Sequence, residues 1–227
     1  MIKERYRRNM NMLSESEIER LASTKVCVVG CGGLGGHVIE MLGRLGVGSL
    51  TVIDGDVFDE SNLNRQILST ESLIGKSKAL AAASRLAEVN SLIDVTPHFT
   101  FLNEENCDDL IRGHDAVVDA LDRMQPRRLL EARCEALGIP LVHGAIGGWY
   151  AQVCTILPGD RIFSRIYPAG TDRGIESELG NPSFTPAVTA SIQVSETLKL
   201  LLNRGELLRN RLLTIDLLDN EFEIFEL

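Results

Sequence analysis

The sequence predicts an α/β fold, and three features lead to that class. Short apolar runs recur along the chain and are separated by segments with helical periodicity. A Gly-rich turn, Gly30-Cys-Gly-Gly-Leu-Gly35, lies directly between the first apolar run and the first long helical segment. Beyond Gly147, strand-like runs follow one another. Together these features predict a Rossmann-like, doubly wound and mostly parallel sheet with antiparallel C-terminal strands.

The first elements follow from local signals. Ser14 and Glu17 have capping-box spacing, which predicts a short helix within residues 14–23 that ends near Ala22. The next three segments are predicted to form a strand, a helix and a second buried strand, at residues 25–30, 34–45 and 49–53. This βαβ unit places the Gly-rich turn between a strand and a helix.

The middle of the chain continues the alternation. Residues 77–89 carry apolar side chains at helical spacing. Three further runs are strand-like, at residues 94–101, 115–120 and 139–142. Between the last two we expect a helix with Pro126 in its first turn, where a missing N–H costs nothing.

The C-terminal part has a different pattern. Residues 149–157 and 161–167 are predicted to form paired strands, followed by a polar crossover loop at 167–186. A helix is expected over 187–203, and two closing strands over 212–217 and 221–225. With no linker or repeat, we predict a single domain over 1–227, comprising a nucleotide-binding core at 25–145 and a C-terminal part at 147–227.

Composition excludes several classes of function. The 227 residues carry a formal net charge of -9, which disfavours phosphate-backbone binding, so we expect no nucleic-acid partner. No apolar stretch approaches the roughly 20 residues needed to cross a bilayer, so we expect no membrane association and a cytoplasmic location. The five cysteines include no CxxC pair, and the four histidines have no ligand spacing. Reduced thiols and no zinc are therefore expected.

The Gly-rich turn and the second strand predict a nucleotide site. The glycines of a GxGxxG motif are Gly30, Gly32 and Gly35, and Gly33 is a fourth glycine within it. Glycine lets a nucleotide approach the backbone, and the free amides at the helix start attract anions. Asp54 ends the second strand, where a carboxylate can bind ribose hydroxyls. A tight packing turn without a ligand is the alternative, which the combination with Asp54 disfavours.

Cationic residues downstream of Asp54 indicate which nucleotide. Arg65 and Lys78 follow it, and ATP needs such donors for its triphosphate. A redox dinucleotide has no evident use for them, although an NAD(P)-dependent oxidoreductase would share the turn and Asp54. Solvated side chains on a loop and a helix start are the simpler explanation for isolated cations.

An ordered set of motifs carries a resemblance to a known family. The chain resembles the ThiF/MoeB/HesA adenylyltransferases, bacterial relatives of ubiquitin-activating enzymes, from its N-terminus to its final strands. The motifs are Arg5-Tyr-Arg-Arg8-Asn, Gly30-Cys-Gly-Gly-Leu-Gly35, Asp54-Gly-Asp56, Asn62-Leu-Asn-Arg65-Gln66, Gly75-Lys-Ser-Lys78 and Asp119-Ala-Leu-Asp122.

The resemblance implies a role for individual residues. Gly33 would approach the nucleotide, Asp54 would hold the ribose, and Lys78 would be the phosphate lysine. Asp122 matches a carboxylate that binds Mg²⁺, and Arg8 matches an arginine that reaches the other subunit's site in a homodimer. The catalytic set is thus Arg8, Arg65, Lys78 and Asp122. The full ATP-binding set is Gly30, Gly32, Gly33, Gly35, Asp54, Asp56, Ser61, Asn62, Leu63, Asn64, Arg65, Gln66, Lys78, Leu121, Asp122 and Arg123.

One lysine of the pair at 76 and 78 is expected to serve the site. Lys76 and Lys78 are two residues apart, so on a helix they would point to nearly opposite sides. Only one of them can then face a nucleotide, and the resemblance selects Lys78.

The reaction that the resemblance implies is adenylylation of a small ubiquitin-like sulfur carrier, ThiS- or MoaD-like, for thiamine, molybdopterin or related sulfur transfer. Its C-terminal glycine carboxylate would attack the α-phosphorus of ATP and release pyrophosphate. The chain departs from the family in its lack of CxxC pairs, in having no cysteine after Cys154, and in Arg123, where many relatives have Asn. We therefore expect no zinc and a reaction that stops at the adenylate.

Three other functions remain open at this stage. The same fold could activate another carboxylate, on a modified tRNA nucleoside or a peptide, although the net charge makes tRNA less attractive. An NAD(P)-dependent oxidoreductase would leave Arg65, Lys78 and Asp122 unexplained. A non-catalytic scaffold is disfavoured by the intact cationic and acidic positions.

Overall fold

A computed structural model describes residues 2–168, 170 and 176–227, and in it one eight-stranded sheet organises the chain. The strand order is β3-β2-β1-β4-β5-β6-β7-β8. Strands β3 to β5 are parallel, and β5 to β8 are antiparallel, which confirms the predicted fold class. The strands are β1 (Lys25–Val29), β2 (Ser49–Ile53), β3 (Asp94–His98), β4 (Ala116–Asp119), β5 (Leu141–Gly147), β6 (Tyr150–Ile156), β7 (Arg211–Asp216) and β8 (Glu221–Glu226).

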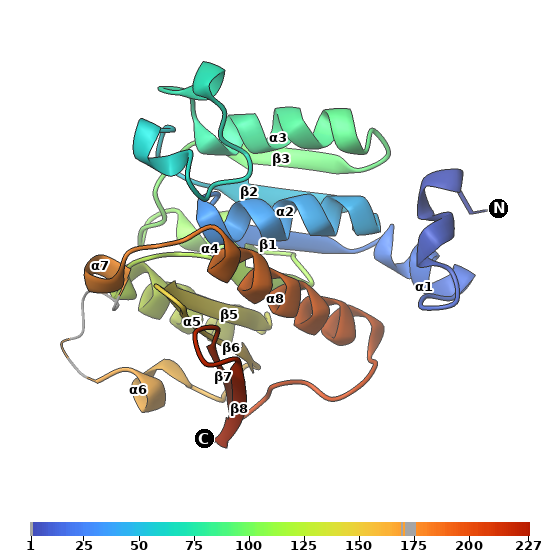
Figure 1. Cartoon of the computed structure of the whole chain (residues 1–227). Helices are drawn as coiled ribbons and strands as arrows, with labels where there is room; N and C mark the ends of the chain where they lie inside the picture. The colour runs from blue at the N-terminus through green and yellow to red at the C-terminus, as the bar shows by residue number, and fades with distance from the viewer. Residues whose placement is uncertain (1, 169, 171–175) are drawn as a thin grey trace.

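Helices cover both faces of the sheet (Figure 1). One face carries α2 (Gly33–Leu45), α3 (Lys78–Val89) and α8 (Phe184–Leu202), and the other carries α4 (Cys107–Ile111) and α5 (Met124–Leu137). The remaining described helices are short: η1 (Glu4–Asn9), α1 (Glu15–Leu21), η2 (Glu60–Asn62), η3 (Glu71–Leu73), α6 (Phe163–Ile166) and α7 (Glu176–Leu179). Among the described residues, no helix combines the length and apolar character that a bilayer crossing requires.

The first strand shows why its sequence is continuously apolar. Val26 and Val28 pack into the core beneath α2, α3 and α8, whereas Cys27 and Val29 pack into the second core, which includes α4 and α5. Successive side chains of a strand point to opposite faces, so a strand buried on both faces needs an apolar residue at every position. The predicted βαβ unit and the capping box of Ser14 with Glu17 are both present.

The segment predicted as a strand at 161–167 is instead irregular at 161–162 and then forms helix α6. Ile162 and Phe163 are consecutive and both fully buried, which a strand with one exposed face does not allow. The backbone amide of Phe163 donates a 2.8 Å hydrogen bond to the Glu131 carboxylate in α5. The pairing edge of β6 is taken by β7 instead.

The boundaries around the predicted crossover loop also differ. Residues 169 and 171–175 of the predicted loop at 167–186 lie outside the described residues. Its described part includes α7 and the start of α8, which begins at Phe184 rather than at 187. Pro186 therefore lies in the first turn of α8, where its missing N–H has no helical partner to lose.

Candidate functional site

The glycines of the Gly-rich turn fall into two groups. Gly30 has φ +100°, and a Cβ there would lie 2.5 Å from the Ala120 carbonyl oxygen. A Cβ at Gly35 would lie 1.8 Å from the Gly30 carbonyl oxygen. These two glycines are required by the packing of strand against helix. By contrast, a Cβ at Gly33 would make only ordinary van der Waals contacts with side chains, at 3.5 Å from the Arg65 Cγ and 3.7 Å from the Pro186 Cγ.

Asp54, the residue after β2, is tied to the same turn. Its Oδ2 accepts a 2.7 Å hydrogen bond from the Cys31 amide, and its Oδ1 accepts one of 2.8 Å from the Asp56 amide. Burial raises the pKa of Asp54, while these two hydrogen bonds and the charge of Lys78 act against the rise. The carboxylate thus holds the Gly-rich turn in place, a task that the sequence motif did not reveal.

Lys78 is buried at the start of α3. Its Nζ lies 3.3 Å from the Asp56 Oδ2, and its charge also acts on Asp54 and Asp59. The ammonium therefore lies among carboxylates beside the Gly-rich turn. Lys76 is exposed and precedes the helix, which begins at Lys78. The two lysines differ in exposure, but the expectation that they lie on opposite sides of one helix was wrong, because only Lys78 is helical.

The loop between β2 and α3 brings Arg65 and Gln66 to the turn. Arg65 Nη1 donates to the Ser61 carbonyl oxygen at 3.0 Å and to the Asn64 Oδ1 at 2.8 Å, while the aliphatic part of the Arg65 side chain lies beside Gly33. Gln66 is buried next to Gly32. Within the described part of the chain, its Oε1 has no hydrogen-bond donor.

The other predicted residues of this loop differ in burial and in the contacts that their side chains make. Asn62 is buried, and its side chain pairs with Asp59 in a reciprocal cap of η2. Asn64 Nδ2 donates to the Asn181 carbonyl oxygen at 3.1 Å. Ser61 and Leu63 are exposed. Arg65 and Gln66 are therefore the residues of this loop whose side chains lie closest to the turn, while Asn62 and Asn64 stabilise the loop.

The turn after β4 carries Leu121, Asp122 and Arg123. Asp122 and Arg123 are exposed, and neither side chain makes a hydrogen bond or ion pair with another described residue. Ala120 packs against Gly30 and Gly35, which places this turn next to the Gly-rich turn. Of the part of the chain that the structure describes, no three His, Cys, Asp or Glu side chains are grouped as a metal site.

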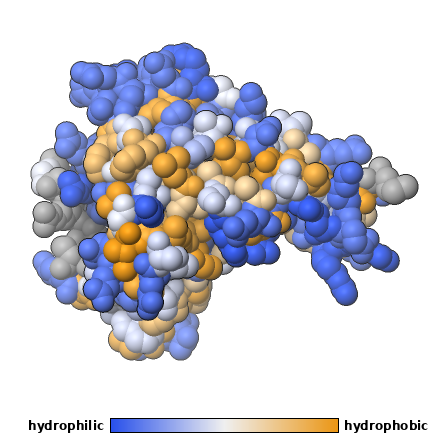
Figure 2. All heavy atoms as spheres, turned by 90° about the horizontal axis from the view of Figure 1, so that it is seen from above, coloured by the Kyte–Doolittle hydropathy of each residue, from blue (hydrophilic) through white to orange (hydrophobic). Residues whose placement is uncertain are grey.

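Arg8 is not near the Gly-rich turn of its own chain. It is exposed on η1, whose Tyr6 ring packs against Gly46 at the C-terminal end of α2. The Gly-rich turn lies at the other end of this 13-residue helix, about 20 Å away. Figure 1 shows η1 and the loop of residues 60–66 at opposite ends of α2, and Figure 2 shows the N-terminal end as a mostly hydrophilic projection.

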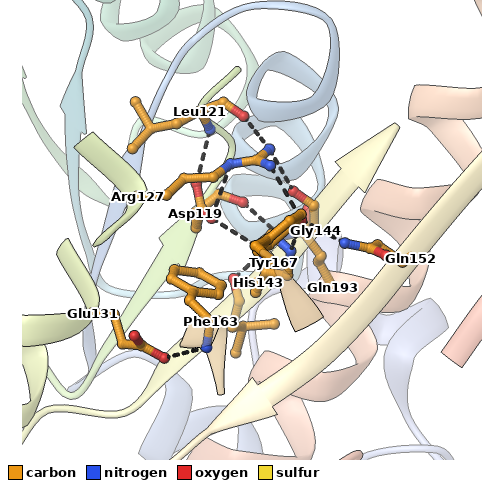
Figure 3. A network of polar contacts seen from close by, with 11 residues as sticks. Asp119, Leu121, Arg127, Glu131, His143, Gly144, Gln152, Phe163, Tyr167 and Gln193 are labelled. Carbon is orange, nitrogen blue, oxygen red and sulfur yellow. Dashed lines mark hydrogen bonds and ion pairs between the residues drawn. The ribbon is translucent and has the colours of Figure 1, made fainter. Parts of the chain in front are cut away.

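A buried polar network beneath the β4 turn was not predicted from the sequence (Figure 3). Asp119 Oδ2 lies 2.7 Å from the His143 Nδ1 and 3.5 Å from the Arg127 Nε. His143 Nε2 lies 3.0 Å from the Tyr167 hydroxyl. That hydroxyl also contacts Arg127 Nη1, at 3.4 Å, and Gln152 Nε2. The side chains come from β4, β5, α5, β6 and the end of α6, so no local spacing signals them.

The ionisation of this network follows from its surroundings. Burial raises the pKa of Asp119, but Arg127 and His143 outweigh it, and the net effect lowers that pKa. Burial lowers the pKa of His143 and raises the pKa of Tyr167 to about 12. A neutral His143 then donates from Nδ1 to the Asp119 carboxylate and accepts at Nε2 from the Tyr167 hydroxyl.

All five cysteines are described, and all are buried free thiols. Burial raises the pKa of Cys107 to about 11 and raises the pKa values of the other four further. A thiol acts as a nucleophile through its thiolate, so none of these side chains is suited to attack an acyl-adenylate.

Comparison with known proteins gives strong similarities over nearly the whole chain. The model of the ThiF family matches residues 6–227. The chain is 38% identical over 207 residues to the SAMP-activating enzyme E1 of Haloferax volcanii, covering 90% of this chain and 77% of that protein. It is 36% identical over 231 residues to the sulfur carrier protein adenylyltransferase of Thermus thermophilus, covering 96% of this chain and 85% of that protein.

Solved structures share the fold. The E. coli MccB structure with ATP superposes with a TM-score of 0.85 at 22% identity, over all of this chain and 71% of that one. The structure of the E. coli tRNA N6-threonylcarbamoyladenosine dehydratase TcdA superposes with a TM-score of 0.74 at 27% identity, over 88% of this chain and 94% of that one.

Proposed function

Because this chain belongs to the ThiF family and is an adenylyltransferase, we propose that it activates the C-terminal glycine carboxylate of a small ubiquitin-like sulfur carrier with ATP. The observation that carries the proposal is the convergence of Asp54, Lys78 and Arg65 on one Gly-rich turn, in a chain similar to carrier-activating relatives along most of its length. A ThiS- or MoaD-like carrier with an extended C-terminal glycine fits this chemistry.

In the proposed reaction, a carboxylate oxygen of the carrier bonds to the α-phosphorus of ATP. The bond from the α-phosphorus to the bridging oxygen breaks, and pyrophosphate leaves with its electron pair. The substrate is the nucleophile, so the protein positions two reactants and offsets the charge that grows on the phosphate oxygens. The Lys78 ammonium lies beside Asp56, its charge acts on Asp54 at the Gly-rich turn, and the Arg65 side chain packs next to Gly33, so both cations are placed to do this.

In this proposal, Asp54 binds the ribose of the nucleotide, and Gly33 allows the nucleotide to approach the backbone. No side chain caps the start of α2 at Gly32, so the amides of its first turn are available to phosphate oxygens. Asp54 uses one lone pair on each oxygen for the amides of Cys31 and Asp56, and the remaining lone pairs can accept ribose hydroxyls.

A magnesium ion fits the exposed carboxylate of Asp122. Mg²⁺ is commonly held by one or two carboxylates together with substrate phosphates and water, so a dedicated group of protein ligands is not needed. Asp122 makes no ion pair or hydrogen bond with another side chain that the structure describes, which leaves its carboxylate available. When bound, Mg²⁺ would neutralise phosphate charge.

Calorimetry and pyrophosphate exchange test this function together. We expect ATP with Mg²⁺ to bind and NAD to give no heat of binding. A carrier with a free C-terminal glycine carboxylate should support ATP–pyrophosphate exchange, because the carboxylate is the nucleophile. The same carrier amidated at its C-terminus is the matched control and should be inert.

Other results of that experiment would favour different functions. Tight NAD binding without a response to ATP would replace the adenylyltransferase proposal with an oxidoreductase. Exchange supported by tRNA instead of the carrier would favour the second candidate, activation of a carboxylate on a modified tRNA nucleoside, which the similarity to TcdA suggests. A thiol-labile conjugate between carrier and enzyme would contradict an adenylate end product.

We further propose that the protein is a homodimer in which Arg8 acts at the partner's site, since Arg8 lies too far from its own Gly-rich turn. Arg8→Ala and Lys78→Ala subunits should each be impaired alone, and an equal mixture should recover about a quarter of wild-type exchange activity. Half of the dimers are then mixed, and each mixed dimer has one site with both residues intact. No recovery in a mixture shown to exchange subunits would rule out a role across the dimer.

A further inference from the structure

The buried network of Figure 3 ends on the turn that carries Asp122. Asp119 Oδ1 accepts a 2.9 Å hydrogen bond from the Leu121 amide. Arg127 Nη2 donates to the Leu121 carbonyl oxygen. The carbonyl of Leu121 belongs to the same planar peptide unit as the amide of Asp122, so its direction sets where the Asp122 side chain begins. Both polar groups of Leu121 are thus held by one buried ion pair.

Arg127 itself is held from the opposite side. Its Nη2 also donates to the Gly144 carbonyl oxygen at 3.2 Å, and its Nη1 donates to the Tyr167 hydroxyl at 3.4 Å. Because the guanidinium is planar, these bonds fix the plane from which it reaches Leu121. Tyr167 is thereby connected to the β4 turn through a rigid group.

The Asp119 carboxylate has a second support. His143 donates to it from Nδ1 at 2.7 Å and is itself oriented by the Tyr167 hydroxyl at its Nε2. The Tyr167 hydroxyl therefore supports both side chains that hold Leu121. It contacts Arg127 directly and is linked to Asp119 through His143. A phenolic hydroxyl has one proton to donate and two lone pairs, and here His143, Arg127 and Gln152 use all three.

We propose that Tyr167 is a positioning residue that acts through the Asp119–Arg127 pair to set the direction of the Asp122 carboxylate toward the magnesium ion of bound ATP. This inference rests on the proposed function, because it takes Asp122 as the magnesium carboxylate. Tyr167 touches no reacting atom. Its hydroxyl keeps the peptide that precedes Asp122 in one orientation. Partners that orient a metal ligand typically change metal affinity or activity 10- to 100-fold when they are removed.

The test is a double-mutant cycle read by nucleotide binding without any carrier. Calorimetry in EDTA and in MgCl₂ measures the affinity for ATP of four proteins: wild type, Tyr167→Phe, Asp122→Asn and the double variant. We expect Tyr167→Phe to leave ATP affinity in EDTA unchanged and to reduce the gain from Mg²⁺ about tenfold. In the Asp122→Asn background, Tyr167→Phe should have no further effect, because its route of action is gone.

Two controls separate positioning from loss of folding. Tyr150→Phe removes a tyrosine hydroxyl elsewhere, on the exposed start of β6, and should leave both affinities unchanged. If Tyr167→Phe does not fold, Gln152→Met removes one donor to the same hydroxyl while keeping side-chain length, and should reduce the Mg²⁺ gain in the same direction by a smaller factor.

Three results would overturn the positioning role: an unchanged Mg²⁺ gain in the Tyr167 and Gln152 variants, an equal loss of ATP affinity with and without Mg²⁺, or a Tyr167→Phe effect that persists fully in Asp122→Asn. If wild-type protein bound no ATP, the proposed function would fail with it. If wild type bound ATP with a clear Mg²⁺ gain and the cycle were additive, only the role of Tyr167 would be rejected.

Discussion

Lys78→Ala should lower carrier-dependent ATP–pyrophosphate exchange by a factor on the order of a hundred or more. Lys78 is buried at the start of α3, its Nζ is 3.3 Å from the Asp56 Oδ2, and its charge reaches Asp54 beside the Gly-rich turn. A cation held in place before the reaction and shielded from water stabilises growing phosphate charge far better than a mobile surface lysine. Exchange of labelled pyrophosphate into ATP at saturating carrier measures the effect.

The neighbouring lysine supplies the matched control. Lys76→Ala should change exchange little, because Lys76 is exposed and lies outside α3. Lys78→Met keeps the buried aliphatic stem and removes the charge, so it should lose as much activity as Lys78→Ala while preserving packing. Equal losses from Lys76→Ala and Lys78→Ala, or wild-type activity in Lys78→Met, would show that the charge of Lys78 does not serve the reaction.

The extent to which the fold was predictable differs between the two halves of the chain. Strand β1 and helix α2 were placed to within a residue or two because a strand buried on both faces must be continuously apolar, and because a glycine turn marks its end. The segment 161–167 was mispredicted because its apolar residues are recruited by a distant helix. Phe163 bonds to Glu131, 32 positions earlier in the chain, and no short window contains that information.

The residues of the candidate site also differ in how far the sequence predicts them, and the reason is again the distance along the chain between partners. Asp54 was proposed for the site because it follows a strand, and parallel strands end at one edge of the sheet. Lys78 was selected over Lys76 by the resemblance to a family, and the structure places it at the start of α3. Asp119 belongs to one of the family motifs, but its partner His143 is 24 residues away, and Tyr167, which contacts His143, is a further 24 residues along the chain. Their convergence depends on the order β1-β4-β5-β6, which the sequence predicts only as a class.

Gly35→Ala should destabilise the protein by about 3 kcal/mol in its free energy of unfolding, whereas Gly33→Ala should change that free energy by less than about 0.5 kcal/mol. A Cβ at Gly35 would lie 1.8 Å from the Gly30 carbonyl oxygen, a backbone atom that cannot move without opening the contact between β1 and α2. A Cβ at Gly33 meets only side-chain atoms, at 3.5 Å or more. Urea denaturation of the two variants measures the difference.

Nucleotide binding should respond to Gly33→Ala although stability does not. Gly33→Ala adds a methyl group beside the Arg65 side chain at the start of α2, where phosphate oxygens would approach the backbone. The affinity of this variant for ATP should therefore fall at least about tenfold, or 1.4 kcal/mol. A Gly33→Ala variant that binds ATP like wild type would mean that the nucleotide does not approach this position. A Gly35→Ala variant as stable as wild type would mean that the turn can relax around a Cβ, and the division of the glycines into packing and binding positions would then be wrong.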